Sequence, residues 1–266
     1  MNAICLAFAI WAAAGPAPEN IAVDEIMKRS LERERQNVRA LDNYTFEQVS
    51  ITKTYDGSGK LKKTETQVEE VLQLDGSRYE KLIEENGKPL PPAKAKREQE
   101  KMDRELARRR NESESAKQKR LREEAKRREE ERKLREEVAQ GYQWKLLGED
   151  TVAGSRCWKI GADPKPGFKG QTRFGKMLLP KMRGILWVDQ NTYEWLRVEA
   201  ETTDKVTFGG FIASLDKGAT FRLEQMRVNN ELWAPRRLEA RAAVRALVVK
   251  QRAGFELEFR NFRKFS

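Results

Sequence analysis

The sequence predicts an α+β fold: an incomplete antiparallel β-barrel of about 11 strands with covering helices, interrupted by a long charged helical insertion. Short runs of aromatic and β-branched residues, separated by Asp, Asn and Gly turns, recur through most of the 266 residues. The second half has no helix-length apolar pattern between these runs, which excludes the alternating strand and helix order of a parallel sheet. One central segment, about 90–141, is instead dense in charge and free of turn residues over most of its length.

The chain opens with an apolar, uncharged run, Ala3–Ala14. It is too short to span a bilayer, which needs about 20 residues, and it has the length of the central part of a secretory signal. Small residues at Ala12 and at the end of the run favour cleavage there. We therefore expect residues 1–14 to be a signal peptide and residues 15–266 to form a single exported half-barrel domain. A buried N-terminal helix of a cytoplasmic protein is the alternative.

The next segment, Val23–Leu41, carries apolar residues at helical spacing among many Arg and Glu residues. Its first turn is acidic, where the helix dipole favours negative charge. It predicts one amphipathic helix.

Between positions 43 and 84, aromatic and β-branched residues are separated by Asp56–Gly59 and by Asp75-Gly76, which are hairpin signals. This part predicts three antiparallel strands.

The charged insertion predicts helix. The segment Ala93–Gln140 contains 18 basic and 13 acidic residues and neither Gly nor Pro. Glu followed four residues later by Arg or Lys recurs along it, a spacing that stabilises a helix by about 0.2–0.5 kcal/mol per pair. No apolar heptad persists, so a long coiled coil is not expected. We predict a solvated helix, or a helical hairpin broken near 111–115.

The charge pattern of the insertion also bears on its partners. Interleaved acidic residues leave it a net charge of only +5, and it has no aromatic residue to stack on a base. Nucleic acid is therefore excluded as a partner. A solvated surface or spacer is the first interpretation, and peripheral contact with an anionic membrane is the second.

The second half of the chain predicts eight further strands, separated by Gly, Asp or Asn turns. These are Gln143–Leu147, Ser155–Ile160, Gly184–Asp189, Leu196–Glu201, Thr220–Val228, Glu231–Ala240, Ala243–Val249 and Phe255–Phe262. The Pro- and Gly-rich stretch 161–182 predicts a loop with a short helix near 174–179. Within it, Gly170–Lys176 has the glycine and lysine spacing of a phosphate-binding loop, but Met177 stands where a Ser or Thr would bind Mg²⁺. We interpret it as a mobile basic loop, not a nucleotide site.

The composition excludes several classes of chemistry. The chain has no histidine and two cysteines, which removes Ser-His-Asp triads, Cys-His pairs and the zinc sites that use histidine or four cysteines. Carboxylates such as Asp189 and Glu199 have no spacing that brings them together as an acid/base pair. Cys157 lies in an alternating strand, so we expect it to be packed. The sequence predicts no enzyme, no metal and no cofactor.

The most informative motif is Gly184–Glu199, which reads Gly-Ile-Leu-Trp-Val-Asp-Gln-Asn-Thr-Tyr-Glu-Trp-Leu-Arg-Val-Glu. It predicts a hairpin whose first strand is apolar on both sides, and such a strand must be covered on each side or border an apolar cavity. The alternative is a sheet that is covered by a helix on one side and by a dimer partner on the other. With the helix that ends in Leu41-Asp42-Asn43-Tyr44, and with alternating Phe residues in the closing strands, this hairpin resembles the LolA-like superfamily of periplasmic outer-membrane lipoprotein-sorting proteins.

The resemblance implies an incomplete barrel around an apolar cavity that shields the acyl chains of a lipid or lipoprotein in the periplasm, without a cofactor. The residues expected to line the cavity are Phe46, Leu186, Val188, Phe221, Leu223, Leu257 and Phe259. The carrier proteins lack the charged insertion. The alternative is therefore an envelope structural or interaction protein that acts through this helical segment. Acyl chains of lipid or lipoprotein are the expected partners, and the sequence identifies no protein partner.

Overall fold

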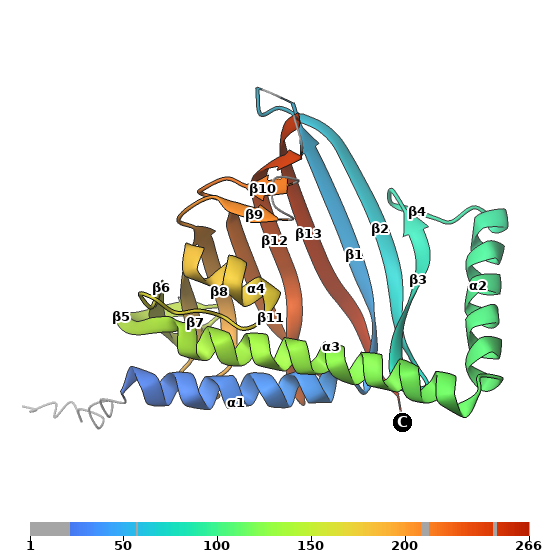
Figure 1. Cartoon of the computed structure of the whole chain (residues 1–266), viewed down its shortest axis with the longest axis horizontal. Coiled ribbons are helices and arrows are strands. Elements are labelled where there is room, and N and C mark those ends of the chain that lie inside the picture. Colours follow the sequence, from blue (N-terminus) through green and yellow to red (C-terminus); the bar gives the residue numbers. More distant parts are fainter. Residues whose placement is uncertain (1–21, 57, 209–212, 247–248, 266) are drawn as a thin grey trace, which may run out of the picture.

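The computed structural model describes residues 22–56, 58–208, 213–246 and 249–265, so the expected signal peptide lies outside the described residues. The strands form one antiparallel sheet (Figure 1). They are β1 (Tyr44–Tyr55), β2 (Leu61–Leu74), β3 (Ser77–Glu85), β4 (Lys88–Pro89), β5 (Tyr142–Val152), β6 (Ser155–Pro164), β7 (Met182–Asp189), β8 (Trp195–Thr202), β9 (Val206–Phe208), β10 (Ala213–Leu215), β11 (Thr220–Val228), β12 (Leu232–Ala246) and β13 (Val249–Lys264). The helices are α1 (Val23–Leu41), α2 (Pro92–Arg110), α3 (Glu114–Gly141), α4 (Arg173–Met177) and the 3₁₀ turn η1 (Leu179–Lys181).

Eleven strands follow one path through the sheet, in the order β4-β3-β2-β1-β13-β12-β11-β8-β7-β6-β5. The first and last long strands pair in the middle, where Ser50 lies opposite Leu257. The path ends at β4 and β5 without closing. This confirms the predicted fold class, an incomplete antiparallel barrel with covering helices. Three short strands, β4, β9 and β10, were not expected, and the run predicted at Ala243–Val249 belongs to the ends of β12 and β13.

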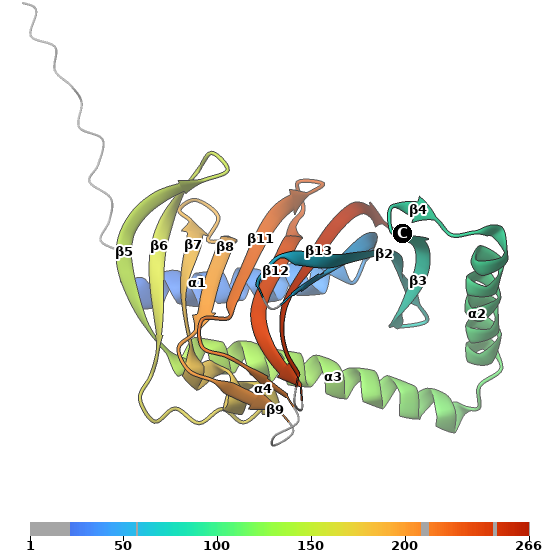
Figure 2. The same cartoon turned by 90° about the horizontal axis from the view of Figure 1, so that it is seen from above.

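Helix α1 has the predicted bounds, with Asp24 and Glu25 in its first turn. It packs across one side of the sheet, from β5 to β12 (Figure 2). Its buried residues Ile26 and Met27 face the sheet. Among the described residues, no helix combines the length and the apolar character that a membrane span requires.

The charged insertion is helical and breaks near 111–115 as predicted, but its two helices meet at a corner and do not pack side by side as a hairpin (Figure 1). Helix α2 ends at Arg110, and α3 starts after Ser113, whose hydroxyl accepts a hydrogen bond from Ala116 N. At this corner, Arg120 forms ion pairs with Glu112 and with Asp75 of the β2–β3 turn, both at 2.6 Å. Helix α3 then returns beside α1 (Figures 1 and 2).

The second half of α3 differs from the solvated spacer that the sequence suggested. Leu134 and Val138 pack against the buried cluster under α1, and Glu137 is buried. The charge density of the segment concealed this, because only these few positions face the sheet. Helix α3 is therefore a second covering helix.

Candidate functional site

The two sides of the sheet differ in character. Cross-strand pairs place Leu186, Val198, Leu223, Leu238 and Leu257 in one row across β7, β8, β11, β12 and β13. Because side chains alternate along a strand, this row lies on one side of the sheet. It is the side that α1 covers, since Leu186 and Val198 pack in the same cluster as Ile26 of α1. We call it the helix side.

The opposite side carries a ladder of charges. Arg183 pairs with Glu201 at 2.5 Å, and Arg222 pairs with Glu199 at 2.7 Å. These residues line an open groove of about 640 Å³ on that side. Glu199 is thus held by an arginine. Asp189 accepts hydrogen bonds from Asn191 N, Thr192 N and Thr192 Oγ1 within its own turn. The structure therefore does not bring Asp189 and Glu199 together as a pair.

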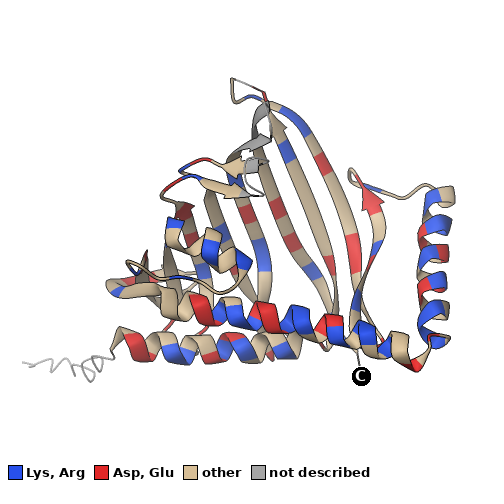
Figure 3. Ribbon diagram, in the orientation of Figure 1, with Lys and Arg blue, Asp and Glu red and all other residues tan. Residues whose placement is uncertain are grey.

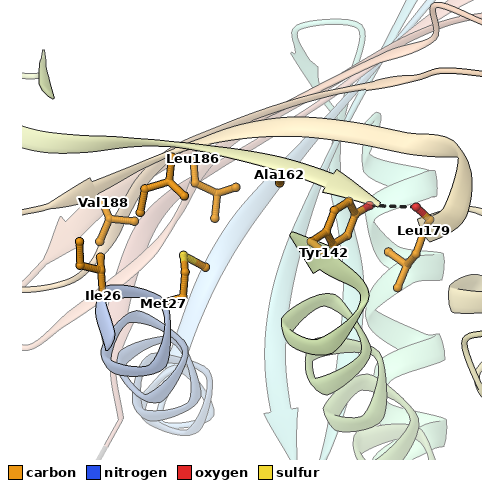
Figure 4. Packing of buried hydrophobic residues seen from close by; sticks show 8 residues of the cluster. Ile26, Met27, Tyr142, Ala162, Leu179, Leu186 and Val188 are labelled. Carbon is orange, nitrogen blue, oxygen red and sulfur yellow. Dashed lines mark hydrogen bonds between the residues drawn. The ribbon is translucent and has the colours of Figure 1, made fainter. Parts of the chain in front are cut away.

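On the helix side, the strands β6 and β7 are fully covered. Leu186 is 4% exposed and Val188 is 0% exposed, and both pack against Ile26 and Met27 of α1 (Figure 4). Tyr142 completes this region and donates a hydrogen bond to Leu179 O at 3.2 Å. Leu186 and Val188 are thus placed in the packed core under α1, which fills the space that an open cavity would need.

On its other side, β7 is covered by the same chain around Trp187. Trp187 packs with Cys157 and Leu196, and its Nε1 donates to Asp150 Oδ2 at 2.9 Å. Cys157 is fully buried, and burial raises the pKa of its thiol to about 11, so it is a packed strand residue as the sequence indicated. The chain itself therefore covers Trp187 on this side of β7, while Ile185 of the same strand borders the open groove.

Further along the row, the apolar side chains are only partly covered. Leu223, Leu238 and Leu257 are half-buried, and the next row adds Phe221 and the 39% exposed Phe255. Phe259 is half-buried on the same side of β13, with its ring centroid 6.0 Å from that of Phe46. These residues lie outside the three buried clusters that the described side chains form. We call the set of Phe221, Leu223, Leu238, Phe255, Leu257 and Phe259 the apolar strip.

Four of the seven predicted cavity residues thus belong to the apolar strip: Phe221, Leu223, Leu257 and Phe259. Phe46 borders it but is 5% exposed, and it is enclosed by Phe259 and Phe262. The sequence reasoning missed Leu238 and Phe255. Strand pairing brings both into the strip, and the alternation in Phe255–Phe262 was the signal available for the second of them.

Helix α1 has apolar contacts at Ile26 and Met27 near one end and at Ala40 and Leu41 near the other. Between them it is attached to the sheet by hydrogen bonds that we call the polar seam. Asn37 Nδ2 donates to Glu194 Oε2 at 2.6 Å, and Trp233 N donates to Asn37 Oδ1 at 3.0 Å. Glu34 accepts a hydrogen bond from Gln225 at 3.3 Å. Burial raises the pKa of both Glu34 and Glu194 above their ordinary range. Ionisation of either carboxyl under α1 is therefore disfavoured by burial.

The segment that resembles a phosphate-binding loop already holds an anion from the chain itself. Glu137 of α3 accepts hydrogen bonds from Gln171 N and Thr172 N, each at 2.6 Å, and from Thr172 Oγ1 at 2.7 Å. Burial alone would raise the pKa of Glu137, but these hydrogen bonds outweigh it and the pKa lies below its ordinary value. The loop is thus fixed to α3 and its donors are occupied, which differs from the mobile loop expected from its composition.

No family model and no curated protein matches this chain. Among solved structures, a putative outer membrane lipoprotein-sorting protein domain from Vibrio parahaemolyticus matches at 8% identity and a TM-score of 0.40, over 92% of this chain and 94% of that one. A LolA superfamily protein from Nitrosomonas europaea matches at 10% identity and a TM-score of 0.36, over 92% of this chain and 94% of that one. MucB in the Pseudomonas aeruginosa MucA/MucB complex matches at 13% identity and a TM-score of 0.25, over 92% of this chain and 99% of that one. These are likenesses at low identity, and none of them identifies a ligand or partner here.

Proposed function

We propose that this protein is a carrier-like binding protein of the periplasm, which holds the acyl chain of a lipid or lipoprotein against the apolar strip. The observation that carries the proposal is the partial exposure of six apolar side chains on the helix side of the sheet, next to rows that α1 closes. An acyl chain on the strip gains about 0.8 kcal/mol for each CH₂ group removed from water. Such binding needs neither a catalytic group nor a cofactor. Outer-membrane lipoprotein sorting is the role we propose for it.

The attachment of α1 supports access to the strip. Over its middle, α1 is held by the polar seam, and Glu194 and Glu34 are disfavoured there when ionised. Apolar contacts of α1 are concentrated at Ile26 and Met27 near one end and at Ala40 and Leu41 near the other. A small displacement of the middle of α1 therefore costs less than removal of its ends.

The test is a titration with a fluorescent polyene fatty acid. Leu257→Gln places an amide in the strip and removes contacts worth about 1.5–3 kcal/mol, so we expect the Kd to rise at least about tenfold. The matched control is Ile51→Gln, because Ile51 is half-buried on the neighbouring strand β1 and points to the opposite side of the sheet. Its Kd should stay within about twofold of the wild type. Equal weakening in both variants, or none in Leu257→Gln, contradicts the proposal.

The alternative function, an envelope structural or interaction protein, is favoured by one observation. Helix α2 packs against β3 and leaves most of its charged residues exposed (Figure 3). Deleting the insertion is not a clean test, because Val138 of α3 packs against the core and Glu137 of α3 holds the loop at Thr172. Replacing exposed basic residues of α2, Lys96, Arg97, Arg104 and Arg110, by Gln separates the two functions. The carrier function predicts unchanged fatty-acid affinity, and the alternative predicts loss of a cross-linked envelope partner.

A further inference from the structure

An arginine-rich groove lies between α1, α3 and the start of β3, on the helices and away from the apolar strip. It has a volume of about 440 Å³ and is lined by seven arginines and four carboxylates. The groove therefore carries a formal excess of three positive charges. Figure 3 shows basic residues, interleaved with acidic ones, along the two helices that border it. We call it the arginine groove.

Part of this charge is neutralised within the groove. Glu124 accepts hydrogen bonds from Arg127 at 2.6 Å and from Arg128 at 3.2 Å. Asp42, at the end of α1, pairs with Arg128 at 3.1 Å and more distantly with Arg78 at 3.9 Å. These pairs join α3 to α1 and to β3. They hold the walls of the groove in place and consume its acidic residues.

Two arginines of the groove are left over. Within the described residues, neither Arg39 nor Arg135 has a carboxylate at ion-pair distance. Arg135 is half-buried, and its Nε is shielded from water without a hydrogen-bond acceptor. A buried donor without a partner is destabilising, so an acceptor supplied by a ligand would be favoured there. The Glu34 carboxylate also acts electrostatically on Arg135, but no hydrogen bond joins the two in the described part of the chain.

We propose that the arginine groove binds a phosphate group, with Arg39 and Arg135 as its principal ligands. A guanidinium presents its N–H groups in a planar fork that matches two oxygens of a phosphate. A phosphate monoester carries up to two negative charges and so fits the local excess of positive charge. The groove also has room for a substituent, since small-ligand sites commonly span about 300–1,000 Å³. A soluble compound and a lipid headgroup both supply such a phosphate, and the proposal does not depend on the apolar strip.

The test is calorimetric titration of the full mature chain with inorganic phosphate at low, constant ionic strength, because salt screens exposed charges. The groove variant is Arg39→Gln with Arg135→Gln. The matched control is Arg110→Gln with Arg122→Gln, which removes the same charge from exposed positions of the insertion that do not line the groove. We expect at least a tenfold loss of phosphate affinity in the groove variant and less than twofold in the control. Circular dichroism checks the fold, and Arg39→Gln alone, at an exposed position, should still weaken binding at least threefold.

A second arm separates the two sources of phosphate. Flotation with phosphatidylcholine vesicles, with and without phosphatidic acid, should show the same loss in the groove variant if the ligand is a lipid headgroup. Binding of inorganic phosphate without vesicle binding assigns a soluble ligand, and both results support the site. Equal losses in the groove variant and the control would mean that diffuse charge attracts the anion. That outcome, or a wild type that binds neither probe, overturns the proposal.

Discussion

Replacing Gly175 by Ala should detach α3 from the loop that it anchors. A methyl group on Gly175 would overlap Glu137 Oε2 and come within 2.9 Å of Thr172 Oγ1. The Glu137 carboxylate cannot turn aside freely, because it accepts hydrogen bonds from Gln171 N, Thr172 N and Thr172 Oγ1 at 2.6–2.7 Å. The substitution must therefore expel the carboxylate or shift α4.

The magnitude follows from those three hydrogen bonds. Hydrogen bonds to a charged group contribute about 1.5–3 kcal/mol each, but water replaces part of this when the loop opens. We therefore expect Gly175→Ala to lower the free energy of unfolding by about 2–4 kcal/mol. Glu137→Ala should cost a similar amount, because it removes the same acceptor. The Glu137→Ala background removes the two closest contacts of the Gly175 methyl group and leaves Thr172 Oγ1 at 2.9 Å, so its cost should fall to about 1 kcal/mol or less.

The assay is urea unfolding of the wild type, the two single variants and the double variant, followed by tryptophan fluorescence and circular dichroism. A double-mutant cycle isolates the coupling between the two positions. The reasoning requires a coupling energy of at least about 1 kcal/mol. Additive costs would show that Gly175 and Glu137 act independently, and would refute the anchoring role of Glu137.

Three further predictions concern the core and the seam. Ile26→Ala should lower the free energy of unfolding by about 2–5 kcal/mol in the same urea assay, because Ile26 is 0% exposed under the sheet; a cost below about 1 kcal/mol would contradict the packing of α1. Glu194→Gln should stabilise the protein at neutral pH, because burial raises the native pKa of Glu194 above its ordinary value of 4.5. The wild type therefore loses stability as pH rises above that value. The Glu194→Gln variant does not, and its amide oxygen still accepts a hydrogen bond from Asn37. Urea midpoints from pH 4 to 8 should thus diverge as pH rises, and parallel curves would contradict the burial. Cys157, whose pKa is raised to about 11, should react with a thiol reagent only at the rate of unfolding; fast labelling of the folded protein would count against its place in the core.

The fold could be predicted where the signals are local. The bounds of α1 follow from apolar spacing and its acidic first turn, and the hairpin turn at Asp75-Gly76 from residues that adopt positive φ. The break between α2 and α3 falls where Ser113 supplies a helix cap. The pairing of β1 with β13 joins residues 197 to 220 positions apart, and no local pattern encodes it.

The candidate site was predictable only in part, for the same physical reason. Alternation along β11 and β13 identifies Leu223 and Leu257 as sharing a side with other apolar residues, which the register bears out. Which of these side chains a helix covers depends on where α1 docks, and the sequence of a strand does not carry that information. Leu186 and Leu223 therefore look alike in sequence, although one lies under α1 and the other lies in the strip.

The central claim, that the apolar strip holds an acyl chain, is tested most directly by what the protein carries when it is isolated. The mature protein is purified from a bacterial periplasm without detergent and extracted with organic solvent, and the extract is analysed by mass spectrometry beside Leu257→Gln and Ile51→Gln. We predict near-stoichiometric lipid or lipopeptide in the wild type and in Ile51→Gln, and little in Leu257→Gln. A folded wild type whose extract matches that of an unrelated periplasmic protein would contradict the claim.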